Sequence, residues 1–254
     1  MNKLKKHRFL FEELVKRDFK KKYKRTILGM GWSVLMPLLQ LLVMKIVFGQ
    51  FFARDINHFT TYLFCGNLLF CWFAEASGSG MRSLYSNAGI FTKVNVPKYL
   101  FLLSVSVQTV INFFLTLIVF FIFCSIDNIT FGWHFLALAY PIFTLLIFNI
   151  GLGLILSALY VFFRDIDYLW SVFLQLLMYG SAIFYKIDGF PAKMQRVFDF
   201  NPIYRHVAYF REVVLQGAIP SLSTHLVLAA FAFSVLFIGA FMYKRYNTRF
   251  LYYV

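Results

Sequence analysis

Two charged residues lie inside long apolar stretches of this sequence and are its first candidates for chemistry. Lys45 falls within residues 31–52 and Glu75 within residues 59–78. An ionisable side chain in a membrane-buried segment is a functional candidate by default, because burying its charge in hydrocarbon is costly. Lys45 is expected in the outer half of one span and Glu75 near the inner end of the next, too far apart to pair. A proton relay needs more acidic or histidine residues at depth, so each charge is expected to reach the interface or to face a polar cavity.

The sequence contains no motif for catalysis, nucleotide binding or metal binding. No glycine-rich loop leads into Gly-Lys-Ser/Thr, and neither HExxH nor GxSxG is present. The three cysteines lie in apolar runs without a CxxC or Cys/His cluster, so neither a zinc site nor a disulfide framework is indicated. Of the aspartates near predicted span ends (Asp165, Asp167, Asp188 and Asp199), no two form a convincing acid–base pair. We expect no catalytic residue, no metal and no cofactor in this chain.

The apolar stretches themselves indicate a membrane protein. The 254-residue chain is 60% hydrophobic and only 14% charged, where a soluble domain is about a quarter charged. A run of about 20 apolar residues crosses a bilayer as a helix, which satisfies its own backbone hydrogen bonds in hydrocarbon. We expect an all-α membrane protein whose single transmembrane domain fills residues 1–254. The six predicted transmembrane helices are residues 31–52, 59–78, 99–125, 133–163, 168–185 and 223–243.

The positive charges are distributed as in a membrane protein. Of the 25 Lys and Arg residues that give the chain its net charge of +14, eleven lie in residues 3–25. With the N-terminus inside the cell, 18 basic residues fall on the inner side and six on the outer side. Excess Lys and Arg mark the cytoplasmic side, so both termini are predicted to be cytoplasmic. This distribution favours membrane topology over nucleic-acid binding.

Two further segments are predicted to be amphipathic helices. Residues 9–25 place Phe11, Val15 and Phe19 at i+4 spacing, which is typical of a helix in the membrane interface. Asp18 lies in the apolar sector of that helix, which suits protein contact slightly better than lipid. Residues 186–220 are too charged to span, yet keep helical apolar spacing. They predict two short re-entrant or interfacial helices that turn at Asn201-Pro202. An ordinary external loop lying on the headgroups is the alternative.

Four stretches carry residue patterns that are more specific than hydropathy. The most specific is LVKRDFKKKYKRTILGMGWSVLMPLLQLLV at residues 14–43, with Arg17-Asp18, Tyr23, Leu28-Gly29, Trp32 and Pro37-Leu38. It resembles the entry of the permease subunits of polysaccharide-exporting ABC transporters of the ABC-2 type. SNAGIFTKVNVPK at residues 86–98 is similar to the loop between their spans 2 and 3, and FFRDIDY at residues 162–168 to the turn between spans 4 and 5. Asn201-Pro202 followed by Arg211 fits their external hairpin.

The resemblance implies a half-transporter rather than an enzyme. It implies a homodimer of six-span subunits in the bacterial cytoplasmic membrane, paired with a separate ATPase subunit that binds ATP and Mg. The implied substrate is a lipid-linked polysaccharide such as O-antigen, teichoic acid or a cell-wall rhamnan, and membrane lipid is the remaining partner. Two alternatives stay open: an ABC-2 permease for a small lipid, drug or haem, and a membrane-embedded acyl- or glycosyl-transferase.

The resemblance also assigns roles to residues. In the family, the loop between spans 2 and 3, here residues 81–98, carries the principal helix that couples to the ATPase. The expected coupling residues are Ser86, Asn87, Gly89, Phe91, Lys93, Arg164 and Asp165. The interfacial helix and substrate entry are assigned to Arg17, Asp18, Lys20, Lys21, Tyr23, Arg25 and Trp32. Its basic residues would attract a lipid-linked pyrophosphate, although anchoring to anionic lipid explains them almost as well.

The external gate is expected in residues 186–220. Its candidate residues are Asn201, Pro202, Tyr204, Phe210 and Arg211. Asp165 and Asp167 are expected to cap the helix that starts the fifth span rather than to touch substrate. The chain also holds 34 Phe residues, most of which should face lipid or pack in the interior. A minority of the aromatic side chains could line a conduit, because their faces stack on sugar rings.

Overall fold

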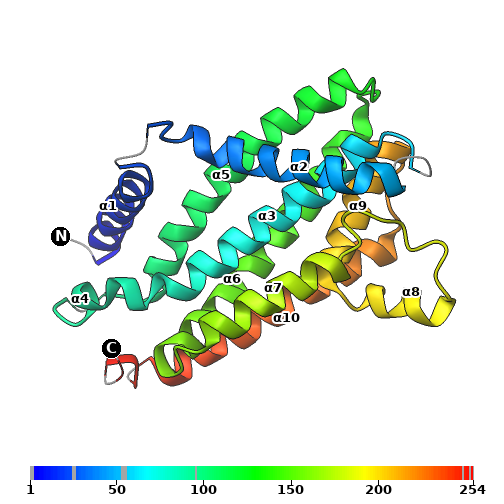
Figure 1. Ribbon diagram of the computed structural model, residues 1–254. Helices are drawn as coiled ribbons and strands as arrows, with labels where there is room; N and C mark the ends of the chain where they lie inside the picture. The colour runs from blue at the N-terminus through cyan, green and yellow to red at the C-terminus, as the bar shows by residue number, and fades with distance from the viewer. Residues whose placement is uncertain are drawn as a thin grey trace.

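The computed structural model describes residues 3–24, 27–52, 56–94, 96–247, 249–251 and 253, and every regular element in these ranges is a helix. In chain order they are α1 (Lys3–Tyr23), α2 (Gly31–Phe52), α3 (Phe59–Ser83), η1 (Tyr85–Asn87), α4 (Ala88–Phe91), α5 (Tyr99–Ile126), η2 (Trp133–Leu138), α6 (Ala139–Phe162), α7 (Ile166–Gly180), α8 (Ala192–Asp199), α9 (Pro202–Gln216), α10 (Leu222–Tyr246) and η3 (Arg249–Leu251), where η marks a 3-10 helix. The long helices run side by side between two ends. α1, α4 and η3 lie at one end, and α8 lies at the other (Figure 1).

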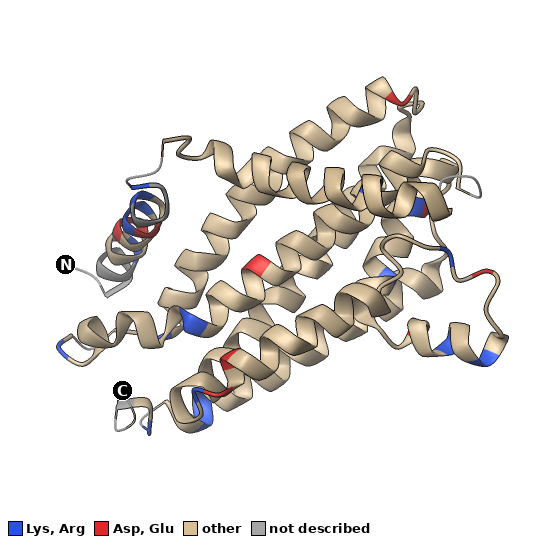
Figure 2. Ribbon diagram, viewed as in Figure 1, with Lys and Arg blue, Asp and Glu red and all other residues tan. Residues whose placement is uncertain are grey.

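Four helical stretches in the described ranges are long and apolar enough to cross a membrane. They are Gly31–Phe52, Tyr99–Ile126, Trp133–Phe162 and Leu222–Tyr246. The other two predicted spans correspond to α3 and α7. α3 is long enough but carries the polar residues Asn67 and Glu75, and α7 has 15 residues where about 20 are needed. Charged residues gather mostly at the two ends of the bundle (Figure 2).

Several predicted helix ends differ in the structure: α1 begins at Lys3 rather than residue 9, and α3 continues to Ser83 rather than ending at residue 78. Two further differences change the path of the chain. The fifth span was expected to run to residue 185, but α7 ends at Gly180. The chain turns there because Ala182 takes a left-handed conformation, with φ of 49°. The fourth span was expected as one helix from residue 133, whereas it begins as the 3-10 helix η2 and becomes α-helical at Ala139. Apolar content extends past both boundaries, so hydropathy alone does not reveal them.

α3 is the central helix of the bundle. It contacts α2, α5, α6, α7 and α9, and buries side chains along most of its length. Helix association in a membrane depends on close van der Waals packing and on buried polar contacts, since lipid tails are as apolar as leucine. The closest packing joins α6 to α10. A Cβ added to Gly239 would lie 2.5 Å from the carbonyl oxygen of Gly151, so both backbones approach only because these positions lack side chains.

Pro37 connects α2 to its neighbours through its effect on the backbone. A proline inside a helix removes one backbone donor and leaves the carbonyl four residues earlier without its helical partner. That carbonyl belongs to Ser33, and it accepts a hydrogen bond from Thr116 Oγ1 of α5 at 3.2 Å. The carbonyl of Pro37 in turn accepts from Asn67 Nδ2 of α3 at 3.1 Å. The break in the helical ladder therefore fixes α2 against both helices.

Candidate functional site

The candidate coupling segment, residues 84–93, lies at the end of α3 and contains η1 and α4. Leu84, Asn87 and Phe91 are buried and anchor the segment to the bundle. Ser86, Gly89 and Lys93 are exposed on its outer side. A Cβ added to Gly89 would meet no atom within 4 Å. The expected coupling residues thus divide into an inner set that holds the segment and an outer set that is open to a partner.

Hydrogen bonds connect the coupling segment to α1. Arg17 Nη2 donates to Asn87 Oδ1 at 2.6 Å and to Asp18 Oδ1 at 2.5 Å. Asn87 Nδ2 donates to the carbonyl of Ser83 at 2.7 Å. Asp18 Oδ2 accepts from Ser104 Oγ of α5 at 2.9 Å. Arg17 and Asp18 were assigned to substrate entry from the sequence, and the structure places them in contact with the coupling segment and with α5.

A polar pocket of about 500 Å³ lies between α1 and the coupling segment. Its lining includes Arg17, Asp18, Arg82, Ser86 and Gln108. Of the other residues assigned to entry, those whose side chains the structure describes, Lys20 and Trp32, do not line it. Lys20 is exposed on α1, Lys21 and Tyr23 belong to α1 by their backbone, and Arg25 lies outside the described residues.

The turn between α6 and α7 also contacts this region. Arg82 Nη2 of α3 lies 2.6 Å from Asp167 Oδ1, and its Nε donates to Asp167 Oδ2 at 3.3 Å. The guanidinium of Arg164 lies over the ring of Tyr85, with its carbon 4.1 Å from the ring centroid. The predicted capping of α7 is wrong, because Asp165 makes no side-chain cap and Asp167 pairs with Arg82. The turn is therefore held by contacts with α3 and η1.

Glu75 lies in a second pocket, of about 550 Å³, between α2 and α3. Trp32 and Cys71 also line it. Glu75 Oε1 accepts a hydrogen bond from Asn112 Nδ2 of α5 at 2.7 Å. Lys45 is exposed on α2. Glu75 thus faces a cavity and has an amide donor.

Arg211 holds the turn that follows the end of α7. It is 7% exposed, and its guanidinium donates to the carbonyls of Tyr62 at 3.3 Å, Ala182 at 2.8 Å and Ile183 at 2.6 Å. A fourth bond reaches the Tyr62 hydroxyl at 2.8 Å. No carboxylate of the described residues forms an ion pair with it. Gly66 provides space for this contact, since an added Cβ would lie 3.0 Å from both Arg211 Nη2 and Ile183 Cγ2.

Asn201 connects the end of α7 to the start of α9. Its Oδ1 accepts from the backbone N–H of Ile203 at 2.9 Å and caps α9, where Pro202 takes the first position. Its Nδ2 donates to the carbonyl of Gly180 at 2.9 Å. Tyr204 lines a third pocket, of about 290 Å³, together with Asp188.

One gate candidate does not lie at an opening. Phe210 is buried in the core, with its ring centroid 5.6 Å from that of Phe120. α9 enters the bundle and contacts α3, α6 and α10, so its apolar face packs on protein. His206 on the same helix is buried too, with Nδ1 2.7 Å from the carbonyl of Pro202 and Nε2 3.1 Å from Thr144 Oγ1. Burial lowers the pKa of His206 to about 4.

Sequence reasoning did not pair Arg82 with Asp167, nor Arg17 with Asn87. The partners lie 85 and 70 positions apart, and no local pattern connects them. The one available signal was that three of the four residues occur in stretches with family resemblance.

Comparison with known proteins places the chain among membrane transporters. A family described as ABC-2 type transporter matches residues 10–215. The O-antigen export system permease protein RfbA of Klebsiella pneumoniae is 28% identical over 220 residues, which cover 83% of each chain. RfbA of Myxococcus xanthus is 25% identical over 94% of this chain and 92% of its own, and the polysialic acid transport protein KpsM of Escherichia coli is 26% identical over 92% of both. The resemblance inferred from the sequence is confirmed.

Proposed function

Since the chain belongs to the ABC-2 type transporter family, we propose that it is the membrane-spanning permease of a polysaccharide exporter. The observation that carries this proposal is the similarity to permeases for O-antigen and polysialic acid along more than four fifths of each chain. The chain is a multi-pass membrane protein whose relatives are transport subunits. The cargo is a lipid-linked polysaccharide, with teichoic acid as one candidate class besides O-antigen. The names of these relatives do not support the alternative of a permease for a small lipid or drug.

The proposed topology has six crossings, with both termini in the cytoplasm. α3 and α7 supply the two crossings beyond the four apolar stretches. α3 is compatible with this role because its polar residues Asn67 and Glu75 bond to neighbouring helices. α7 is short, and the chain beyond Gly180 completes its path as a turn held by Arg211. α1, α4 and η3 lie together at one end of the bundle (Figure 1), which agrees with one cytoplasmic face in the bacterial cytoplasmic membrane.

A separate ATPase subunit, which would bind ATP and Mg, is proposed to dock on the outer side of the coupling segment. Ser86, Gly89 and Lys93 are exposed there, while buried neighbours fix the segment to α3. A displacement of this segment would be transmitted to α1 through Arg17 and to α7 through the ion pair Arg82–Asp167. Motion could therefore pass from one docking surface to two different helices.

A homodimer is proposed to form around α2 and α7. Within the described ranges α7 buries no residue, and α2 buries only Leu41 and Met44. Gln175 is exposed on α7, and no hydrogen-bond partner for its amide is found in the described part of the chain. An unpaired amide facing lipid is costly, so this face suits a partner helix or a hydrated conduit better than acyl chains.

The test uses two glycines that are both open to solvent at opposite ends of the molecule. An added Cβ meets no atom within 4 Å at Gly89 or at Gly189, so a side chain can leave the backbone at either position without a clash. The chain is co-expressed with the ATPase encoded beside it, and the ATPase that copurifies is measured. Gly89→Trp should abolish copurification and polysaccharide export, whereas Gly189→Trp should leave copurification unchanged. If only Gly189→Trp abolishes copurification of the ATPase, the proposed topology is inverted. If both variants retain the ATPase, the coupling segment is not the docking surface.

A further inference from the structure

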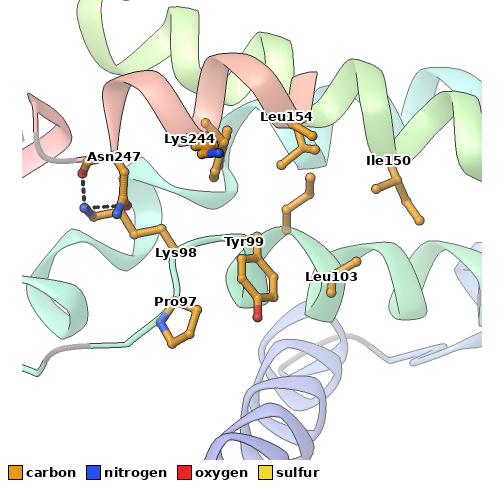
Figure 3. A pocket seen from close by; sticks show the side chains of 11 residues that line it. Pro97, Lys98, Tyr99, Leu103, Ile150, Leu154, Lys244 and Asn247 are labelled. Atoms are coloured by element: carbon orange, nitrogen blue, oxygen red, sulfur yellow. Dashed lines mark hydrogen bonds between the residues drawn. The ribbon is translucent and has the colours of Figure 1, made fainter. Parts of the chain in front are cut away.

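A groove of about 450 Å³ runs between α5, α6 and α10 near the end of the bundle where α4 lies. Its walls are almost entirely apolar, and its polar groups gather at one end. Lys98 and Asn247 lie at that end, while Leu103 and Ile150 lie at the other (Figure 3). The remaining lining residues are Pro97, Tyr99, Leu102, Leu154, Ala240, Tyr243 and Lys244.

α6 forms the floor of the groove because it packs closely against both neighbours. Gly153 of α6 accommodates Leu102 of α5, whose Cδ1 would lie 2.7 Å from an added Cβ. Gly239 of α10 lies against Gly151 of α6 in the same way. These three glycines keep α6 deep between α5 and α10. Larger side chains of α5 and α10, farther from α6, then form the two walls of the groove.

The polar end carries two positive charges without a carboxylate partner in the described part of the chain. Lys98 is 8% exposed, and its Nζ donates to the backbone carbonyl of Asn247 and, at 3.1 Å, to Asn247 Oδ1. Burial lowers the pKa of Lys98, because the ammonium group has lost part of its hydration. Lys244 is exposed at the last turn of α10. An anion at this end would compensate both charges.

We propose that this groove binds an anionic phospholipid from the surrounding bilayer. The phosphate would lie at Lys98 and Lys244, and an acyl chain would lie along Leu103, Ile150 and Ala240. Basic pockets between transmembrane helices on the cytoplasmic side recognise anionic head groups in this way, and the apolar walls match a lipid tail.

The occupant is a resident lipid and not the exported cargo. None of the lining residues belongs to α2 or α7, the helices proposed to face the partner subunit and the conduit. The inference therefore depends on membrane insertion but not on the identity of the transported polysaccharide. It is tested on the chain alone, without the ATPase.

The experiment measures retention of phosphatidylglycerol by the full chain in detergent, using native mass spectrometry, with phosphatidylcholine of the same acyl chains for comparison. Two variants act on different parts of the groove. Lys244→Gln removes one charge at the polar end and should weaken phosphatidylglycerol binding about five-fold, as one basic residue near an anionic lipid contributes roughly 1 kcal/mol. Ala240→Phe fills the apolar part of the groove and should abolish retention, although it leaves both lysines in place.

Arg245→Gln is the matched control. Arg245 is exposed on the same turn of α10 but does not line the groove, so the same loss of charge there should leave retention unchanged. The proposal is overturned by any of three results: Arg245→Gln weakens binding as much as Lys244→Gln, Ala240→Phe retains the lipid, or phosphatidylcholine binds as tightly as phosphatidylglycerol. These outcomes say nothing about copurification with the ATPase, so a failure here is separate from a failure of the proposed function.

Discussion

Replacing Arg211 by methionine should destabilise the protein, although it removes a buried charge that has no carboxylate partner. The substitution leaves the carbonyls of Ala182 and Ile183, which lie in the turn after α7, without their donor. The Tyr62 carbonyl also loses its contact with Arg211 but keeps its helical hydrogen bond inside α3. An unsatisfied buried group costs about 1–3 kcal/mol, so the two together cost roughly 2–6 kcal/mol, and removing the desolvated guanidinium offsets part of that cost. We expect a net loss of about 1–2 kcal/mol in the free energy of unfolding.

The assay is equilibrium unfolding of the purified chain in mixed micelles. Arg211→Lys should give a smaller loss, because an ammonium group still donates to some of the carbonyls, although it reaches fewer of them than the planar guanidinium does. Arg205→Met is the control on the same helix. Arg205 pairs with Asp199 at 3.4 Å and is partly exposed, so its loss should cost less than about 1 kcal/mol. If Arg211→Met unfolds at the same or a higher denaturant concentration than the parent, the cost of burying the guanidinium outweighs its hydrogen bonds. The conclusion that Arg211 stabilises the turn after α7 is then refuted.

Three further predictions concern coupling, pH and packing. Reversing the charge of Arg82 or of Asp167 alone should lower export roughly two- to five-fold, as expected for a partly exposed ion pair. Exchanging the two charges in a double variant should restore export. If the double variant exports no better than the single ones, the pair has no role in coupling. Because burial lowers the pKa of His206 from 6.5 to about 4, its contribution to stability is present above pH 6.5 and is lost as the pH falls towards 4. Unfolding should therefore cost about 2 kcal/mol less at pH 5 than at pH 7, and a His206→Gln variant that keeps this slope would contradict the assignment. Gly239→Ala should destabilise the chain by about 1–3 kcal/mol, because its Cβ would lie 2.5 Å from a backbone carbonyl of α6. The control Gly78→Ala, where an added Cβ meets no atom within 4 Å, should stabilise α3 by up to about 1 kcal/mol. Equal melting temperatures of the two variants would argue against the close α6–α10 contact.

Local signals in the sequence were sufficient for the turn at Asn201-Pro202. An Asn side chain caps the helix and Pro occupies its first position, and both preferences depend only on adjacent residues. The length of the apolar run likewise placed a helix at residues 31–52, where the structure has α2. Local reasoning was not sufficient everywhere. It failed for Asp165 and Asp167, because capping competes with Arg82, which the tertiary fold brings from α3.

Hydropathy could not distinguish a side chain that faces lipid from one that faces protein. Both environments are apolar, so the pattern of α9 predicted a re-entrant or interfacial helix without showing which of its apolar side chains pack on protein. In the structure Phe210 is buried in the core. The hydrogen-bond partners of polar residues were not predictable for a related reason. Glu75 was predicted to be an intramembrane charge, but its donor Asn112 lies 37 positions away in the sequence.

The sequence by itself determined that the chain is a helical membrane protein, where most of its helices lie and to which family it belongs, because apolar run length, charge distribution and short motifs are properties of neighbouring residues. Only the tertiary structure decided that Arg17 meets Asn87, that Arg82 meets Asp167, and that α5, α6 and α10 enclose an apolar groove with two lysines at one end. Those contacts depend on how closely the helices approach one another, and that distance is set by small residues such as Gly151 and Gly239 at helix crossings.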